Sequence, residues 1–207
     1  MNKIKIRNNG ELEDKVNDAF DMLRVNMEFA DADAKTIVIT SPSDKEGKSL
    51  ISFQLACNMA ENDKRVLLIM ADFRKSIAGN NKQKTVVGMS EAVLGKAGLN
   101  DTVFMTDIPN LFIMFAGKQT EDMDKLVSSP SFEKMLKIFK NKFDYILFDS
   151  ASVINNVTTS LICSKCDGTI LIIEQGETSY EKAFRAKEQI ELTGCKIIGT
   201  VINAPSK

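Results

Sequence analysis

The sequence of 207 residues has no histidine and only four cysteines, which limits the metal and redox chemistry that it can support. Two of the cysteines, Cys163 and Cys166, form a Cys-x-x-Cys pair, and the others are Cys57 and Cys195. Without histidine or a second such pair, a zinc site is poorly supplied with ligands. A redox pair typically follows an early strand at the start of a helix, whereas this pair stands late in the chain. The pattern therefore favours small buried thiols over a metal or redox role.

The sequence also lacks an excess of charge of one sign and a long apolar run. Its 27 Lys and Arg residues stand against 28 Asp and Glu residues, so no basic surplus exists to neutralise a nucleic-acid backbone. No apolar run approaches the roughly 20 residues of a transmembrane helix. Residues 1–7 (MNKIKIR) lack the apolar core of a signal peptide. We expect a cytoplasmic protein that binds no nucleic acid, with residues 1–207 forming one domain.

Short apolar runs alternate with helical patterns along the chain. The runs predicted as strands are residues 37–39, 66–70, 111–115, 145–148, 169–173 and 197–202. The predicted helices are residues 11–30, 50–62, 90–95 with Ser90 as N-cap, 131–141, 157–165 and 180–193. Residues 74–88 are polar and are predicted as a loop. This alternation predicts an α/β fold, doubly wound, with a mostly parallel sheet and helices on both faces.

The tripeptide Gly47-Lys48-Ser49 is the strongest functional signal in the sequence. It follows a β-branched run and precedes a helical pattern, as a phosphate-binding loop does, although Pro42 stands where the first glycine of that loop is usual. Backbone N–H groups at such a turn bind anions, the lysine supplies a positive charge for the β- and γ-phosphates, and the serine hydroxyl is a ligand for Mg²⁺. The residues predicted to bind the nucleotide here are Asp44, Lys45, Glu46, Gly47, Lys48, Ser49 and Leu50.

Polar residues follow several of the predicted strands, where the carboxyl ends of a parallel sheet would bring them together. Asp72 and Asp149 each follow an apolar run, and with the hydroxyl of Ser49 they could hold Mg²⁺. Each acid alone could equally be a strand-end cap or a turn former. Asn203 follows the last strand and could contact an adenine edge, or it could form a simple Asx turn before Pro205.

Several segments together resemble one family. Residues 39–49 (ITSPSDKEGKS), 65–75 (RVLLIMADFRK) and 143–150 (FDYILFDS) resemble the Walker A, A′ and B motifs of bacterial tyrosine kinases of the capsular and exopolysaccharide type. That family shares its P-loop fold with the partitioning and division-site ATPases. Residues 18–26 resemble its N-terminal oligomerisation helix, and residues 199–203 resemble its last strand. The joint pattern is specific, whereas each piece alone is not.

The resemblance implies transfer of the γ-phosphoryl group of ATP to tyrosine hydroxyls, in the regulation of capsule or exopolysaccharide synthesis. The residues implied to carry catalysis are Lys48, Asp72 and Asp149, and those implied to hold Mg²⁺ are Ser49, Asp72 and Asp149. The resemblance also implies a membrane adaptor as activator, which could recruit the protein to the inner face of the membrane. Residues 1–35 would form an N-terminal oligomerisation region, with contacts between copies made through residues 11–30.

The sequence departs from the family at three informative positions. Met70 stands where the second motif carries its first acid, and a thioether cannot accept the proton of an attacking hydroxyl. Lys45 replaces a loop glycine that could require a positive φ, and the acids beside it place negative charge near an anion site. Asp21 reverses the middle charge of the oligomerisation motif, which predicts weakened assembly into rings.

Three functional readings are compatible with these residues. The first is an ATP-dependent protein-tyrosine kinase, and the second is a degenerate homologue that acts as a nucleotide-binding regulatory module with little catalysis. The third is a partitioning-type ATPase, which is disfavoured because Ser43 stands where those ATPases carry a signature lysine. Met70 is the residue that separates the first two readings.

Overall fold

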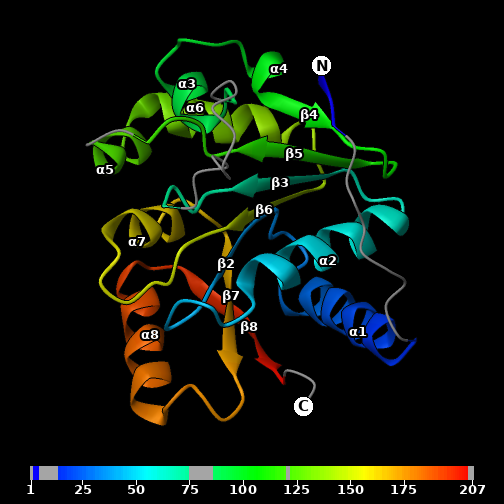
Figure 1. Cartoon of the computed structure of the whole chain (residues 1–207), viewed down its shortest axis with the longest axis vertical. Helices are drawn as coiled ribbons and strands as arrows, with labels where there is room; N and C mark the ends of the chain where they lie inside the picture. Colours follow the sequence, from blue (N-terminus) through cyan, green and yellow to red (C-terminus); the bar gives the residue numbers. More distant parts are fainter. Residues whose placement is uncertain (1, 5–13, 75–85, 120–121, 205–207) are drawn as a thin grey trace, which may run out of the picture.

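A single mixed sheet organises the fold. The computed structural model describes residues 2–4, 14–74, 86–119 and 122–204. Its eight strands lie in the order β1-β4-β5-β3-β6-β2-β7-β8 (Figure 1). All neighbouring pairs are parallel except β4 and β5. The strands are β1 (Asn2–Lys3), β2 (Thr36–Thr40), β3 (Val66–Met70), β4 (Val103–Met105), β5 (Leu111–Phe115), β6 (Tyr145–Asp149), β7 (Gly168–Glu174) and β8 (Lys196–Asn203).

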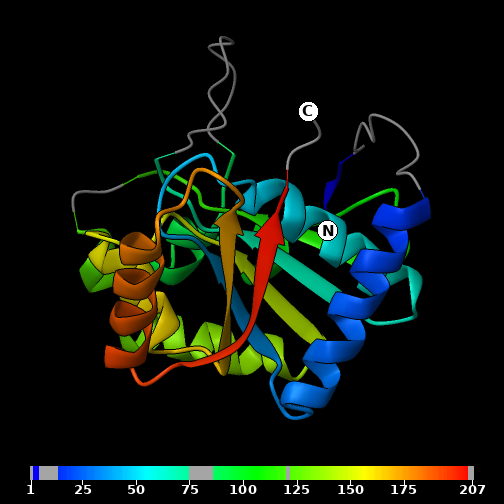
Figure 2. The ribbon, with the colours of Figure 1, turned by 90° about the horizontal axis from the view of Figure 1, so that it is seen from below.

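Helices cover both faces of this sheet (Figure 2). Helices α1 and α2 pack on one face, and α3, α5, α6, α7 and α8 pack on the other. Their bounds are α1 (Asp14–Ala30), α2 (Lys48–Glu61), α3 (Met89–Val93), α4 (Leu99–Thr102), α5 (Met123–Val127), α6 (Pro130–Lys140), α7 (Val157–Cys163) and α8 (Tyr180–Leu192). The predicted doubly wound α/β class is confirmed. In the described part of the chain, no helix is both long and apolar enough to cross a bilayer.

The central strands are apolar on both sides because each side faces a layer of helices. In β3, Leu67 and Ile69 contribute to the core under α6 and α7, whereas Val66 and Leu68 contribute to the core under α1 and α2. Successive side chains of a strand point to opposite faces, so a continuous apolar run is what a doubly covered strand requires. The first polar groups therefore stand at or just beyond the carboxyl ends of these strands, as Asp149 does at the end of β6 and Asp72 does two residues after β3.

The elements predicted from the sequence are present, with ends that differ by a few residues where the structure describes them. The prediction that Ser90 is an N-cap is wrong, because α3 begins at Met89 and its N-cap is Gly88. The backbone N–H of Gly88 donates to Glu91 Oε2, so a carboxylate from inside the helix satisfies the N–H of the N-cap residue. The short elements β1, β4, α4 and α5 were not predicted from the sequence. Residues 11–13 of the predicted first helix, and 75–85 of the predicted polar loop, lie outside the described residues.

The cysteines are free thiols, and three of the four are buried. Burial raises the pKa of Cys57 and of Cys163 to about 12, so both thiols are protonated at neutral pH. The hydroxyl of Thr169 lies 3.2 Å from the sulfur of Cys195. Within the described ranges, no group of three or more histidine, cysteine or acidic side chains is arranged to hold a metal ion. Cys57, Cys163 and Cys195 are thus buried thiols that pack in the two cores.

Phe139 anchors α6 in the core and provides a test of this packing. Its side chain is buried, and its ring meets that of Phe143 edge to face, with centroids 5.9 Å apart. We expect Phe139→Ala to lower the free energy of unfolding by about 3–5 kcal/mol, measured by urea denaturation. The control is Lys137→Ala, which changes an exposed residue of the same helix and should stay within about 0.5 kcal/mol of wild type. A Phe139→Ala loss no larger than that of the control would contradict this packing.

Candidate nucleotide site

A cavity of about 520 Å³ lies at the carboxyl edge of the sheet, where β2 runs into α2 and β3 ends. Its volume falls in the range of about 300–1,000 Å³ that is usual for small-molecule sites. The lining residues are Asp44, Lys45, Gly47, Lys48, Ser49, Leu50, Asp72 and Arg74. The structure thus brings six of the seven predicted loop residues, and one of the two predicted strand-end acids, around one space.

The loop between β2 and α2 owes its shape to two residues in the left-handed region. Lys45 has φ of 68° and Gly47 has φ of 84°, and α2 begins at the next residue, Lys48. Alternation of this kind turns successive backbone N–H groups toward one side and forms an anion-binding concavity. The expectation that position 45 requires a positive φ is confirmed, and a lysine adopts it there at an energetic cost that a glycine would avoid.

Lys48 is buried at the first position of α2. Its Nζ donates to Ser41 Oγ at 2.7 Å and to the carbonyl oxygen of Ser43 at 3.0 Å. Both acceptors belong to the same loop, so the ammonium group is positioned within the loop that it lines. A lysine held in this way presents its positive charge to the cavity at a defined place.

Glu46 is buried and turned away from the cavity. Its carboxylate accepts hydrogen bonds from the backbone N–H of Ser43 and from the hydroxyl of Thr178, which lies in the turn before α8. The side-chain amide of Asn203 donates to the carbonyl oxygen of Glu46 at 3.3 Å and lies against Gly47. Glu46 therefore connects the loop to the ends of β7 and β8, and its carboxylate does not line the cavity.

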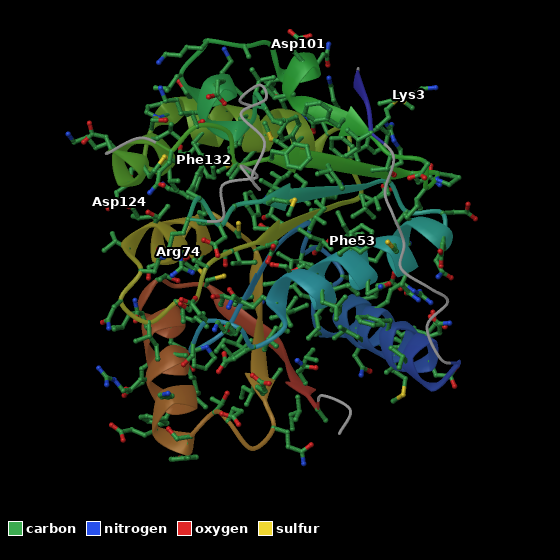
Figure 3. The ribbon with its side chains drawn as sticks, in the orientation of Figure 1. Lys3, Phe53, Arg74, Asp101, Asp124 and Phe132 are labelled. Carbon is green, nitrogen blue, oxygen red and sulfur yellow. The ribbon has the colours of Figure 1, made fainter. Side chains whose placement is uncertain are left out.

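Arg74, which is labelled in Figure 3, lines the cavity and bridges two acids of its wall. Its Nε donates to Asp72 Oδ1 at 3.0 Å, and its Nη2 donates to Asp44 Oδ1 at 2.8 Å. Ser152 also donates to Asp44. These hydrogen bonds, the one from Arg74 first, hold the pKa of Asp44 below its usual value. The same two carboxylates raise the pKa of Arg74, and the Asp72 contact is the largest cause.

Asp149 lies one strand away from Asp72 in the sheet. It ends β6, where its register partners are Met70 of β3 and Ile39 of β2, and its side chain is buried. It does not line the cavity surface, in contrast to Lys48, Ser49 and Asp72. Met70, where the family carries an acid, is thus the direct neighbour of Asp149 at the carboxyl edge.

Three residues of the site have no predicted role in the sequence analysis, namely Arg74, Ser152 and Thr178. Arg74 stands in the polar stretch after β3, but nothing in the sequence shows that it bridges Asp44 and Asp72, which are 28 residues apart. Thr178 follows β7, and the rule that ligands gather at strand ends would have identified its segment. Ser152 follows β6 closely, so the same rule applies to it.

Lys45 provides a test of the loop geometry. We expect Lys45→Gly to raise the free energy of unfolding by about 0.5–1 kcal/mol, because relief of left-handed strain exceeds the added entropy of a glycine in the unfolded chain. The matched control is Lys45→Ala, which removes the side chain but keeps the Cβ that causes the strain. Denaturant titrations of the three proteins measure the difference. Equal stability of the glycine and alanine variants would contradict the strained loop.

Comparison with known proteins agrees with this geometry. Residues 34–191 match the AAA domain family. The tyrosine-protein kinase CpsD of Streptococcus agalactiae is 33% identical over 191 residues, which cover 91% of this chain and 83% of that protein. The tyrosine-protein kinase YwqD of Bacillus subtilis is 29% identical over 184 residues, covering 87% and 78%.

A solved structure of a tyrosine kinase domain is also similar to this chain. The BceF tyrosine kinase domain is 28% identical to this chain, covers 98% of it and 83% of its own length, and superposes with a TM-score of 0.84. The match spans the nucleotide loop, both acid-bearing strand ends and the helices on both faces. The chain belongs to the AAA domain family and, within it, to the bacterial tyrosine-protein kinases represented by CpsD.

Proposed function

We propose that this protein transfers the γ-phosphoryl group of ATP to tyrosine hydroxyls of proteins and thereby regulates capsule or exopolysaccharide synthesis. The observation that carries the proposal is the cavity that Lys48 and Ser49 of the loop line together with Asp72, which follows β3. Phosphoryl transfer depends mainly on positioning and charge stabilisation, and this cavity supplies both. The names of the relatives, which are tyrosine-protein kinases, support the choice of acceptor.

ATP would bind with its phosphates against the N–H groups of residues 45–49 and the ammonium group of Lys48. Hydroxyl and carboxylate oxygens are the donors that Mg²⁺ prefers, so Ser49, Asp72 and Asp149 fit this ion, which would neutralise charge on the phosphates. Asp44, Leu50 and the loop backbone would complete the contacts. Asn203 would reach the adenine edge from the end of β8, and its bond to the loop supports that place beside the nucleotide.

The acceptor proton needs an oxygen base, and Met70 cannot supply one. Asp72 lies in the cavity wall, and Arg74 donates hydrogen bonds to both of its carboxylate oxygens. Once Arg74 turns to the nucleotide, one oxygen can face the cation while the other accepts the proton. A carboxylate placed for metal binding is not optimally placed as a base, which predicts slow transfer. Since the transition state is loose and proton transfer contributes only part of the acceleration, loss of the acid at position 70 lowers the rate without removing the activity.

Met70 also supports a second candidate, a nucleotide-binding regulatory module with little catalysis. Both candidates require the same cavity, so binding of ATP does not separate them. A phosphorylation rate that depends on Lys48 separates them, because only the kinase requires catalysis.

We expect the wild-type protein to phosphorylate a tyrosine peptide slowly with Mg²⁺ and ATP. Lys48→Met should lower that rate by about 10²–10³-fold, because the charge on the transferring group loses its stabilisation. Met70→Asp should raise it by about 10²-fold, since it restores a general base beside Asp149. Transfer of radiolabelled phosphate to a single-tyrosine peptide measures all three rates.

The control for position 70 is Met70→Leu, which keeps the apolar packing and should leave the rate unchanged. The regulatory module would be favoured if the wild-type protein binds Mg²⁺ and ADP in calorimetry but has no phosphorylation activity above that of Lys48→Met. Absence of both binding and turnover would contradict both candidates.

We propose that the protein acts in the cytoplasm, where a membrane adaptor protein of a polysaccharide export system recruits it, and that copies contact one another through residues 11–30. Exposed apolar side chains on α1 support the contact: Met22 is 66% exposed and Phe29 is 85% exposed, seven residues further along the same helix face. Asp21 Oδ1 accepts hydrogen bonds from Arg24 and from Asn58 of α2. The reversed charge thus engages Arg24 within its own chain.

We expect Asp21→Arg to increase assembly, because it releases Arg24 from this internal pair and restores the positive charge of the family motif. Asp21→Asn is the matched control and should show a smaller change, since it removes the negative charge without reversing it. Multi-angle light scattering at several protein concentrations measures the mass. A stable higher-order ring formed by the wild-type protein would contradict the weakened assembly.

A further inference from the structure

A second cavity, of about 210 Å³, adjoins the nucleotide cavity. Asp72 and Arg74 line both, so these two side chains form the wall between them. The second cavity is lined by residues that follow β3 and β6, by residues at the start of α7, and by Gln119 and the start of α5 (Figure 3, in which Arg74 and Asp124 are labelled). It is smaller than the roughly 300 Å³ at which drug-sized sites begin, and its size suits a single side chain.

The walls of this second cavity combine apolar and hydrogen-bonding groups. Phe73 and Met123 supply apolar surface, and both are mostly buried. Asn156, Thr158 and Thr159 supply amide and hydroxyl groups. A phenol needs this combination, because its ring is apolar and its hydroxyl is polar. Thr158 donates to Asp124, so a carboxylate fixes the side chain of this wall.

We propose that the second cavity receives the acceptor tyrosine, while the triphosphate occupies the first cavity. This inference rests on the proposed kinase function and identifies where its second substrate binds. The phenolic oxygen forms the new P–O bond as the bond from the γ-phosphorus to the bridging oxygen of the β-phosphate breaks. ADP leaves with that electron pair, and the phenolic proton passes to Asp72 in the shared wall.

The charges of the second cavity favour the neutral substrate over its product. Asp72 and Asp124 carry two negative charges, against one positive charge on Arg74. These three charged groups do not repel a neutral phenol, whereas their net negative charge repels the phosphate group of a phosphotyrosine. The cavity therefore binds tyrosine in preference to phosphotyrosine, and this difference promotes release of the product.

Gln119 provides the test, because it lines the second cavity, does not line the first, and is exposed enough to be replaced without disturbing the core. Gln119→Trp fills the cavity and should raise KM for a single-tyrosine peptide by about 10–200-fold, the range for a misfit in a side-chain pocket. The affinity for Mg²⁺ and ADP in calorimetry should stay unchanged. The matched control is Lys118→Trp, which adds the same bulk at the preceding exposed residue outside the cavity and should leave KM unchanged.

A binding measurement makes the result independent of catalysis. In the presence of Mg²⁺ and ADP, fluorescence anisotropy should show that the tyrosine peptide binds the wild-type protein more tightly than its phosphotyrosine form, and that Gln119→Trp removes this binding. If wild-type turnover exists and Gln119→Trp keeps the wild-type KM, the acceptor assignment is wrong and the kinase function remains. If the wild-type protein shows no Lys48-dependent turnover and no preference between the peptides, the kinase function fails and the acceptor assignment fails with it.

Discussion

The turn that joins β2 to α2 is the constraint on which the rest of the site depends. Its two left-handed residues, Lys45 and Gly47, point backbone N–H groups toward one cavity and start α2 at the lysine that lines it. A turn of this shape carries strain at position 45, so something else must hold it. The buried carboxylate of Glu46 does this by accepting hydrogen bonds from Ser43 within the loop and from Thr178 outside it.

The doubly covered sheet determines which groups can reach this turn. Because helices cover both faces of β3, β6 and β2, these strands are apolar along their length and polar only where they end. The acids at positions 72 and 149 are therefore confined to one edge, on adjacent strands, beside the loop. The same architecture places Met70 next to Asp149 in the register of β3 and β6, so the position where the family carries an acid lies at this carboxyl edge, beside the cavity.

Much of this arrangement could be predicted from the sequence, because its signals are local. Apolar runs, helical spacing and the Gly-Lys-Ser turn each lie within a few residues, and they gave the fold class, the loop and the positive φ at Lys45. The contacts that sequence analysis missed join distant segments. Arg74 bridges Asp72 and Asp44, and Thr178 reaches Glu46 across 132 residues. The residue type of Ser90 predicts an N-cap, but the helix begins one residue earlier and its N-cap is Gly88, whose N–H donates to Glu91.

The position of Arg74 unites the two cavities in one mechanism. Its guanidinium group pairs with Asp72 and Asp44 and so neutralises part of the negative charge that would otherwise oppose a triphosphate. An arginine pairs with phosphate oxygens as readily as with carboxylates, because its planar fork fits both. A γ-phosphate bound beside this wall would therefore compete with Asp72 for the N–H groups of Arg74. Release of Asp72 from Arg74 would leave its carboxylate available to cation and acceptor together, so that nucleotide binding itself prepares the base that the chain lacks at position 70.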